Sequence, residues 1–67
     1  MMTITLNGKP HETAGPLSLE ELLESLGMAG KPVVAELDEK AVFPRDFAST
    51  TVEAGAKVEV VALAAGG

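Results

Sequence analysis

Residues 18–27 have the sequence SLEELLESLG, which contains the strongest periodic pattern in the chain. Leucines recur there at spacings of three and four residues, whereas the glutamates fall on the opposite face, as in an amphipathic helix. Ser18 followed by Glu21 has the form of a capping box, and Gly27 suits the left-handed residue beyond a helix end. The pattern predicts a helix over Leu19 to Leu26, with leucines in the core and glutamates in solvent. The leucines are Leu19, Leu22, Leu23 and Leu26, and the glutamates are Glu20, Glu21 and Glu24.

The segment before this helix predicts a β-hairpin. Residues 3–6 alternate threonine with isoleucine and leucine, which is typical of a half-buried strand. Asn7 and Gly8 follow, and this pair readily takes positive φ at both central positions of a hairpin turn. The second strand, at about residues 9–13, is polar and contains Pro10, which cannot donate to a strand ladder. We therefore expect the second strand at an edge of the sheet.

The segment after the helix predicts three further strands. Residues 33–37 form an apolar, β-branched run, and residues 41–43 form a short strand that Pro44 ends. Residues 57–63 alternate polar and apolar side chains at first and then become apolar at every position. A central place in the sheet, or an outer surface that faces another protein, explains this change.

One helix among five strands indicates an α+β fold. Residues 46–51 are expected to form a loop or a single helical turn that returns Phe47 to the core. The chain has no room for repeated βαβ units. The economical arrangement is a mixed sheet of four to five strands with one main helix packed across it. The order of the elements alone leaves the strand pairing open.

The composition limits the classes of function. A domain of 67 residues buries only about 60% of the surface that its unfolded chain exposes, so we expect no enclosed catalytic cavity. Ten acidic residues against five basic ones argue against nucleic acid as a partner. Without cysteine the chain has no disulfide, thiolate metal site or nucleophilic thiol. A basic leader and a membrane-length apolar run are both missing, so we expect a cytoplasmic protein with no membrane partner.

The side chains indicate no catalytic or metal site. His11 is the only histidine, and we expect it to be exposed in the polar hairpin. The helix glutamates form an acidic surface patch that can attract a basic partner. The serines and aspartates lack a nucleophile elbow or an oxyanion hole. We therefore expect that the protein is not an enzyme.

The sequence ends in Ala64, Ala65, Gly66 and Gly67, directly after the last predicted strand. These residues form either a frayed tail or a functional one. Glycines have no Cβ atom, so they can thread a narrow channel and present the α-carboxylate of Gly67. Four residues reach at most about 14 Å, which is enough to enter the active site of a partner. Composition alone leaves both alternatives open.

The chain resembles a known family over essentially its whole length. The segments that carry the resemblance are residues 6–9, 19–23, 42–45 and 58–67. They are similar to the ubiquitin-like β-grasp sulfur carriers, and the pair Pro44 and Arg45 points to the thiamine-biosynthesis carriers among them. Two surface turns depart from the usual family pattern, at residues 38–40 and 55–56.

The resemblance implies a β-grasp domain at residues 1–63, with its last strand parallel to the first in the middle of the sheet, and a flexible Gly-Gly tail at residues 64–67. An E1-like adenylating enzyme (ThiF-type) would use ATP to adenylate the Gly67 carboxylate. Sulfur from a persulfide donor would then give a thiocarboxylate, which thiazole synthase (ThiG-type) consumes. Gly66 and Gly67 must be slender enough for both closed sites. The chain would then be a sulfur-carrying cosubstrate that binds no cofactor of its own.

The resemblance also implies a docking patch beside the tail. Of its members, Phe43 is expected in the core of the domain and Leu63 at the interface. Arg45 either pairs with an acidic partner surface or is solvated in its loop. The net charge of −5 suggests docking on basic protein surfaces. The candidate partner-binding residues are Val61, Leu63, Phe43, Arg45, Ala64 and Ala65.

Two alternative functions remain open. The same carrier chemistry can supply sulfur to molybdopterin, tRNA thiolation or amino-acid synthesis, because surface detail selects the acceptor enzyme. A ubiquitin-like modifier or binding module is the other alternative, and its terminal carboxylate is unused or is joined to a lysine amine.

Overall fold

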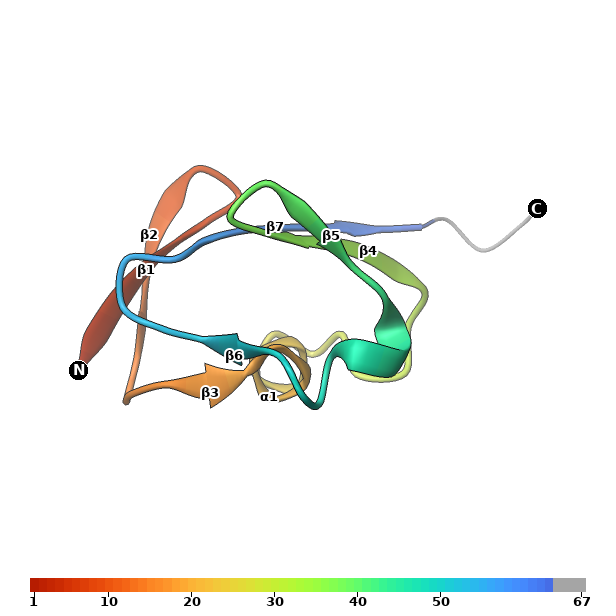
Figure 1. The fold of residues 1–67 in the computed structure, drawn as a ribbon, viewed down its shortest axis with the longest axis horizontal. Helices are drawn as coiled ribbons and strands as arrows, with labels where there is room; N and C mark the ends of the chain where they lie inside the picture. The colour runs from red at the N-terminus through yellow and green to blue at the C-terminus, as the bar shows by residue number, and fades with distance from the viewer. Residues whose placement is uncertain (64–67) are drawn as a thin grey trace.

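The computed structural model describes residues 1–63. Its main sheet has five strands in the order β2-β1-β7-β4-β5 (Figure 1). The last strand, β7, runs parallel to β1 and antiparallel to β4, so it lies in the middle of a mixed sheet. The predicted α+β fold and the central position of the last strand are confirmed. The strands are β1 (Met2–Leu6), β2 (Lys9–Thr13), β4 (Val33–Leu37), β5 (Lys40–Val42) and β7 (Lys57–Ala62).

Two tight hairpins join neighbouring strands of this sheet. In the β1–β2 turn, Asn7 has a φ of 49° and Gly8 a φ of 82°, as the Asn-Gly pair predicts. β2 pairs only with β1, so it is the edge strand that its polar sequence indicates. In the β4–β5 turn, Asp38 and Glu39 also take positive φ values, of 50° and 70°, although neither is a glycine.

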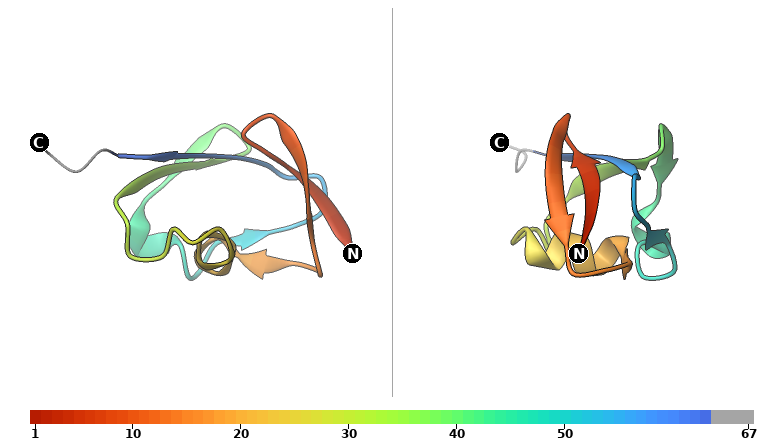
Figure 2. Two further views of the ribbon diagram at one scale, coloured as in Figure 1. Left: turned by 180° about the vertical axis from the view of Figure 1, so that it is seen from behind. Right: turned by 90° about the vertical axis from the view of Figure 1, so that its left-hand side faces the viewer.

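The helix α1 spans Leu19–Ser25 and lies across one face of the sheet (Figures 1 and 2). The capping box at its start is present: the Glu21 N–H donates to Ser18 Oγ at 3.0 Å, and the Ser18 N–H donates to Glu21 Oε1 at 2.8 Å. Leu26 is the C-cap, and Gly27 follows with a φ of 75°. The helix therefore ends one residue before the predicted end, and Gly27 is the first left-handed residue after it, as expected.

The core lies between α1 and the inner face of the sheet. Leu19, Leu22 and Leu23 are buried and Leu26 is half-buried, so the leucine stripe is the domain's own core, as predicted. The three helix glutamates are exposed. No polar or charged residue among those described is buried. The buried residues are Met2, Ile4, Leu19, Leu22, Leu23, Val33, Ala35, Phe47, Val52, Ala56, Val58 and Val60.

A second, smaller sheet was not expected from the sequence. The strands β3 (Leu17–Ser18) and β6 (Thr51–Val52) have two residues each and pair in antiparallel fashion. The Leu19 N–H donates to the Thr50 carbonyl at 2.8 Å, so this small sheet holds the first turn of α1. Two residues are too few to display the period of two on which strand prediction depends.

The segment before β6 corrects one prediction. A 3-10 turn at Pro44–Asp46 precedes Phe47, which is buried, so the expected helical turn returns Phe47 to the core but begins at Pro44. Phe43 was expected in the core as well, and that expectation is wrong, because Phe43 is 59% exposed. β5 ends at Val42, which faces inward opposite Ala35, so the alternation of the extended chain turns Phe43 outward.

Candidate functional site

The carboxyl end of β7 is paired with a neighbouring strand on one side only. On the β4 side, pairing continues from Leu37↔Val58 to Val33↔Ala62, and the Leu63 N–H donates to the Pro32 carbonyl at 2.9 Å. On the β1 side, only Thr5↔Lys57 and Leu6↔Val58 are paired. Residues 59–62 therefore extend beyond the paired part of β1, toward the carboxyl end of the chain (Figure 1).

The side chain of Asn7 contacts β7 just past the last paired residues. The Val60 N–H donates to Asn7 Oδ1 at 2.8 Å, and Asn7 Nδ2 donates to the Val60 carbonyl at 3.2 Å. We call these two hydrogen bonds the Asn7 bridge. The Asn7 backbone N–H also donates to the Val58 carbonyl at 2.9 Å. The amide of Asn7 thus takes the place that a further strand residue would occupy beside Val60.

Three exposed apolar side chains form a row across the outer face of the sheet, opposite α1. Val61 is 60% exposed and lies directly across from Val34, which is 47% exposed. Phe43 follows Val42, the partner of Ala35, so the same register places Phe43 beside Val34. We call Val61, Val34 and Phe43 the apolar row. It begins on β7, one residue past the Asn7 bridge.

Charged residues border the apolar row. Glu59 lies across from Glu36, which in turn lies across from Ala41 on β5, so the next row of the outer face carries two carboxylates. On the other side, the guanidinium Cζ of Arg45 lies 5.2 Å from the centroid of the Phe43 ring. Arg45 Nε is 3.9 Å from Asp46 Oδ2, and the Arg45 side chain is 80% exposed, so solvent screens this pair. The Arg45 guanidinium is available to a partner.

Leu63 is the last residue that the structure describes, and it is 51% exposed. It borders an open groove beneath the end of β7. The groove is mostly apolar and is lined by Gly30, Lys31, Pro32, Val33, Pro44, Phe47 and Leu63. Leu63 and Val61 are thus both accessible to a partner, as a docking role requires.

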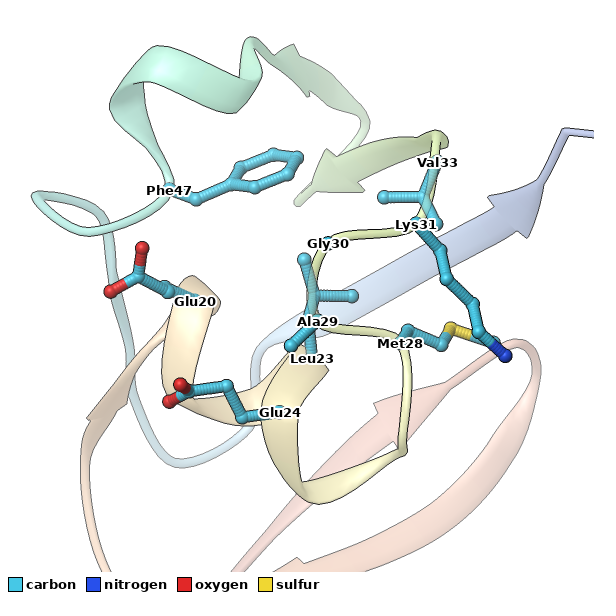
Figure 3. A pocket seen from close by; sticks show the side chains of 9 residues that line it. All are labelled: Glu20, Leu23, Glu24, Met28, Ala29, Gly30, Lys31, Val33 and Phe47. Atoms are coloured by element: carbon cyan, nitrogen blue, oxygen red, sulfur yellow. The ribbon is translucent and has the colours of Figure 1, made fainter.

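A neighbouring hollow lies between α1, Phe47 and the loop that follows the helix (Figure 3). Its volume is about 140 Å³, well below the roughly 300 Å³ at which small-molecule sites begin. Figure 3 shows the carboxylates of Glu20 and Glu24 on one side and the ammonium of Lys31 on the other, with Leu23 and Ala29 between them. The hollow brings no acid and base together.

Other side chains with chemical potential are dispersed. His11 lies on β2 across from Ile4, and it is half-buried, whereas full exposure was expected. Among residues 1–63, no three histidine, aspartate or glutamate side chains are grouped as a metal site would require. Over the same residues, no helix has the length and apolar character of a membrane span.

Two residues of this region were missed by sequence reasoning. Asn7 was assigned only to its turn, and its partner Val60 is 53 positions away. Val34 was assigned only to its strand. The signal for Val34 was present: two successive valines open that strand, so one of them must face away from the core. The predicted site residues Ala64, Ala65, Gly66 and Gly67 lie outside the described residues.

Comparisons with known proteins place the chain in a family. A model of the ThiS family matches residues 4–67. The crystal structure of thiamine biosynthesis protein ThiS from Geobacter metallireducens has a TM-score of 0.84 at 36% identity, over 98% of this chain and 100% of that chain. An NMR solution structure of a thiamine biosynthesis protein from the same organism has a TM-score of 0.81 at 36% identity, over 98% and 88% of the two chains.

A relative in Porphyra purpurea, the uncharacterized protein ycf40, is 32% identical over 66 residues, which cover 98% of this chain and 93% of that protein. The family model covers the helix and the sheet apart from the first two residues of β1, and each solved structure matches over 98% of this chain. The family model also includes the last residues of the sequence. The chain therefore belongs to the ThiS family.

Proposed function

We propose that this protein carries sulfur for the formation of the thiazole of thiamine, as a thiocarboxylate on Gly67. The observation that supports this most is the family match, which extends through Gly66 and Gly67. The likeness to a thiamine biosynthesis protein over 98% of the chain favours the thiamine pathway among the pathways open to sulfur carriers.

The proposed chemistry begins with a carboxylate, which is a poor electrophile. An oxygen of the Gly67 carboxylate attacks the α-phosphorus of ATP, and pyrophosphate leaves. The terminal sulfur of a persulfide then attacks the acyl carbon of the adenylate, and AMP leaves. A thiol reduces the resulting acyl disulfide to the thiocarboxylate. Thiazole synthase takes up the sulfur and returns Gly67 to the carboxylate form.

The carrier and its partners divide this work. The hollows among the described residues are open or small, so the reactive intermediates need closed sites that partners supply. Gly66 and Gly67 have no Cβ atoms and can enter such sites. An E1-like adenylating enzyme (ThiF-type) would bind the ATP, and the carrier would bind no cofactor of its own. The chain is then a cosubstrate, and we place the reaction in the cytoplasm, where ATP is available.

The docking surface that we propose is the apolar row together with Arg45 and Leu63. All of these side chains are exposed, and the row begins on the strand that leads to the tail. Exposed apolar side chains that cluster at one place on a small domain are typical of a protein interaction site. Ala64 and Ala65 would connect this surface to the reactive end.

The experiment that tests the proposal is mass spectrometry of the carrier after incubation with the adenylating enzyme, ATP and a persulfide donor. We expect a mass increase that corresponds to one oxygen replaced by sulfur at Gly67, and its loss when thiazole synthase and its other substrates are added. A variant without Gly67 is the matched control and should stay unmodified.

Two results would contradict the proposal. An unmodified carrier, or an isopeptide adduct as the only product, would exclude sulfur carriage. A thiocarboxylate that thiazole synthase does not consume would move the carrier to another acceptor, such as molybdopterin synthesis or tRNA thiolation.

A further inference from the structure

The Asn7 bridge is not required by the turn that contains it. A two-residue hairpin turn of the kind seen here has positive φ at both central positions, and glycine or aspartate can supply this as well as asparagine. Asn7 has the φ of 49° that the turn needs. Its side chain additionally forms hydrogen bonds with both the N–H and the carbonyl of Val60, on β7. The turn explains the positive φ of Asn7 but does not explain the hydrogen bonds of its side chain with Val60.

The bridge acts where β7 has lost its neighbour. Pairing with β1 ends at Val58, whereas β7 continues to Ala62 with β4 alone on its other side. A strand that is bonded along one side only is free to twist or lift at its open side. Within residues 1–63, the Asn7 amide makes the only hydrogen bonds to Val60 on that side.

We infer that Asn7 is a positioning residue, whose amide fixes the direction in which β7 leaves the sheet and thereby where Gly67 is presented to the partner's active site. This inference rests on the proposed function. Leu63, the last described residue, is three positions past Val60, which is a reach of about 10 Å. A rotation of about 5° at Val60 therefore displaces Leu63, from which the tail leaves, by up to about 1 Å.

A displacement of that size is large for catalysis. Misplacing a reacting group by about 1 Å can cost on the order of 100-fold in rate. The cost in stability should be limited to the two part-buried hydrogen bonds of the bridge, because Asn7 is itself exposed and is not part of the hydrophobic core. The bridge can thus be removed while the fold is kept, so its effect on the adenylation rate can be measured separately from its effect on stability.

The test uses two variants of Asn7 in the full chain. Asn7→Gly keeps positive φ accessible and removes the bridge. Asn7→Asp keeps the acceptor for the Val60 N–H but sets a carboxylate oxygen against the Val60 carbonyl, in place of the donor now at 3.2 Å. Ser18→Ala is the matched control. It also removes a hydrogen bond between a side chain and the backbone, but this bond caps the start of α1, away from β7.

The first readout is adenylation, measured as pyrophosphate release by the activating enzyme over a range of carrier concentrations. For Asn7→Gly and Asn7→Asp we expect kcat to fall about 10-fold or more while KM changes little, because the docking surface is intact. Ser18→Ala should keep the kcat of the unmodified chain. Equal kcat values for the unmodified chain and Asn7→Gly would overturn the inference, and so would an equal loss in Ser18→Ala.

The second readout is hydrogen exchange of the backbone amides, which does not depend on any enzyme. Asn7→Gly should raise the exchange rate of the Val60 amide relative to that of Val58, whereas Ser18→Ala should leave this ratio unchanged. An unchanged ratio in Asn7→Gly would overturn the inference. If the wild-type chain itself is not adenylated, the proposed function fails. This outcome is distinct from one in which the wild-type chain and Asn7→Gly are adenylated at the same rate, which overturns only the inference.

Discussion

The two halves of β7 differ in what surrounds them, although they belong to one strand. In the first half, Val58 is fully buried and has strand partners on both sides. Lys57 is also fixed: its N–H donates to Asp38 Oδ1 at 2.9 Å, and its carbonyl accepts from the Asp38 N–H at 2.7 Å. In the second half, Val61 is 60% exposed and only β4 pairs with it.

On the proposed function, this difference separates stability from partner docking along a single strand. The first half anchors the strand in the core between β1 and β4. The second half carries one end of the apolar row and leads toward the tail. A carrier whose reactive group is at its end needs both properties, because the anchored half provides a fixed base from which the other half presents the tail. Each prediction below changes one of these halves or a residue beside it.

The largest effect on stability is expected in the anchored half. Val58→Ala removes two methyl groups from a fully buried site and should lower the free energy of unfolding by about 2 kcal/mol. Val61→Ala is the same substitution three positions later, and it should change stability by less than about 0.5 kcal/mol. Urea denaturation measures both. Equal losses would contradict the division of β7 into two halves.

The next effect concerns docking. Val61→Ala combined with Phe43→Ala removes the two ends of the apolar row and should raise the Kd for the adenylating enzyme about 10-fold, or about 1.4 kcal/mol. The thermal midpoint should stay close to that of the unmodified chain, because both side chains are exposed. Thr3→Ala, on the outer face of β1, is the matched control. An unchanged Kd in the double variant would remove the row from the docking surface.

A smaller effect, in the direction of greater stability, is expected at the β4–β5 turn beside the anchored half. Glu39 has a φ of 70°, which a glycine adopts without strain, so Glu39→Gly should stabilise the domain by about 0.5 to 1 kcal/mol. The lost ion pair with Lys57 is exposed and offsets only a few tenths of this amount, by order of magnitude.

Asp38→Gly in the same turn is the comparison for that change. Asp38 also has positive φ, but its side chain accepts a hydrogen bond from the Lys57 N–H. Its replacement should therefore stabilise less than Glu39→Gly, or should destabilise. Calorimetry of the two variants checks the ranking, and the reverse order would mean that the hydrogen bond from the Lys57 N–H to Asp38 contributes little to stability.

The smallest effect is that of salt on partner binding. With a net charge of −5 and with Glu36 and Glu59 beside the apolar row, association with a basic partner surface should weaken roughly 2- to 5-fold between low and high ionic strength. Glu59→Gln should reduce this dependence without unfolding the domain. Binding that strengthens with salt would indicate an interface in which these carboxylates are repelled.

The fold was predictable where the signals are local. The capping box and the β1–β2 turn are both present as expected. Each depends on residues only a few positions apart, which are Ser18 and Glu21 for the box and Asn7 and Gly8 for the turn. The two-residue strands β3 and β6 depend on each other across the chain, so no local window contains them. Phe47 is buried as expected, whereas Phe43 is exposed against expectation, because the strand alternation that points Val42 inward turns Phe43 outward before the turn at Pro44.

The candidate site was predictable only in part. Val61, Leu63, Phe43 and Arg45 are all accessible, as docking residues must be, but their exposure alone does not identify a partner. Val34 became part of the apolar row only through the register of β4 and β7. The Asn7 bridge joins residues at opposite ends of the sequence, and only the folded sheet brings them together.

The central claim is that sulfur is carried on Gly67. The most direct measurement supplies a persulfide labelled with a heavy sulfur isotope, together with ATP and the adenylating enzyme, and fragments the carboxyl-terminal peptide in a mass spectrometer. The account predicts the label on the Gly67 acyl group and its transfer to the product when thiazole synthase is added. Label on any other residue, or no label on a folded carrier that binds the adenylating enzyme, would contradict it.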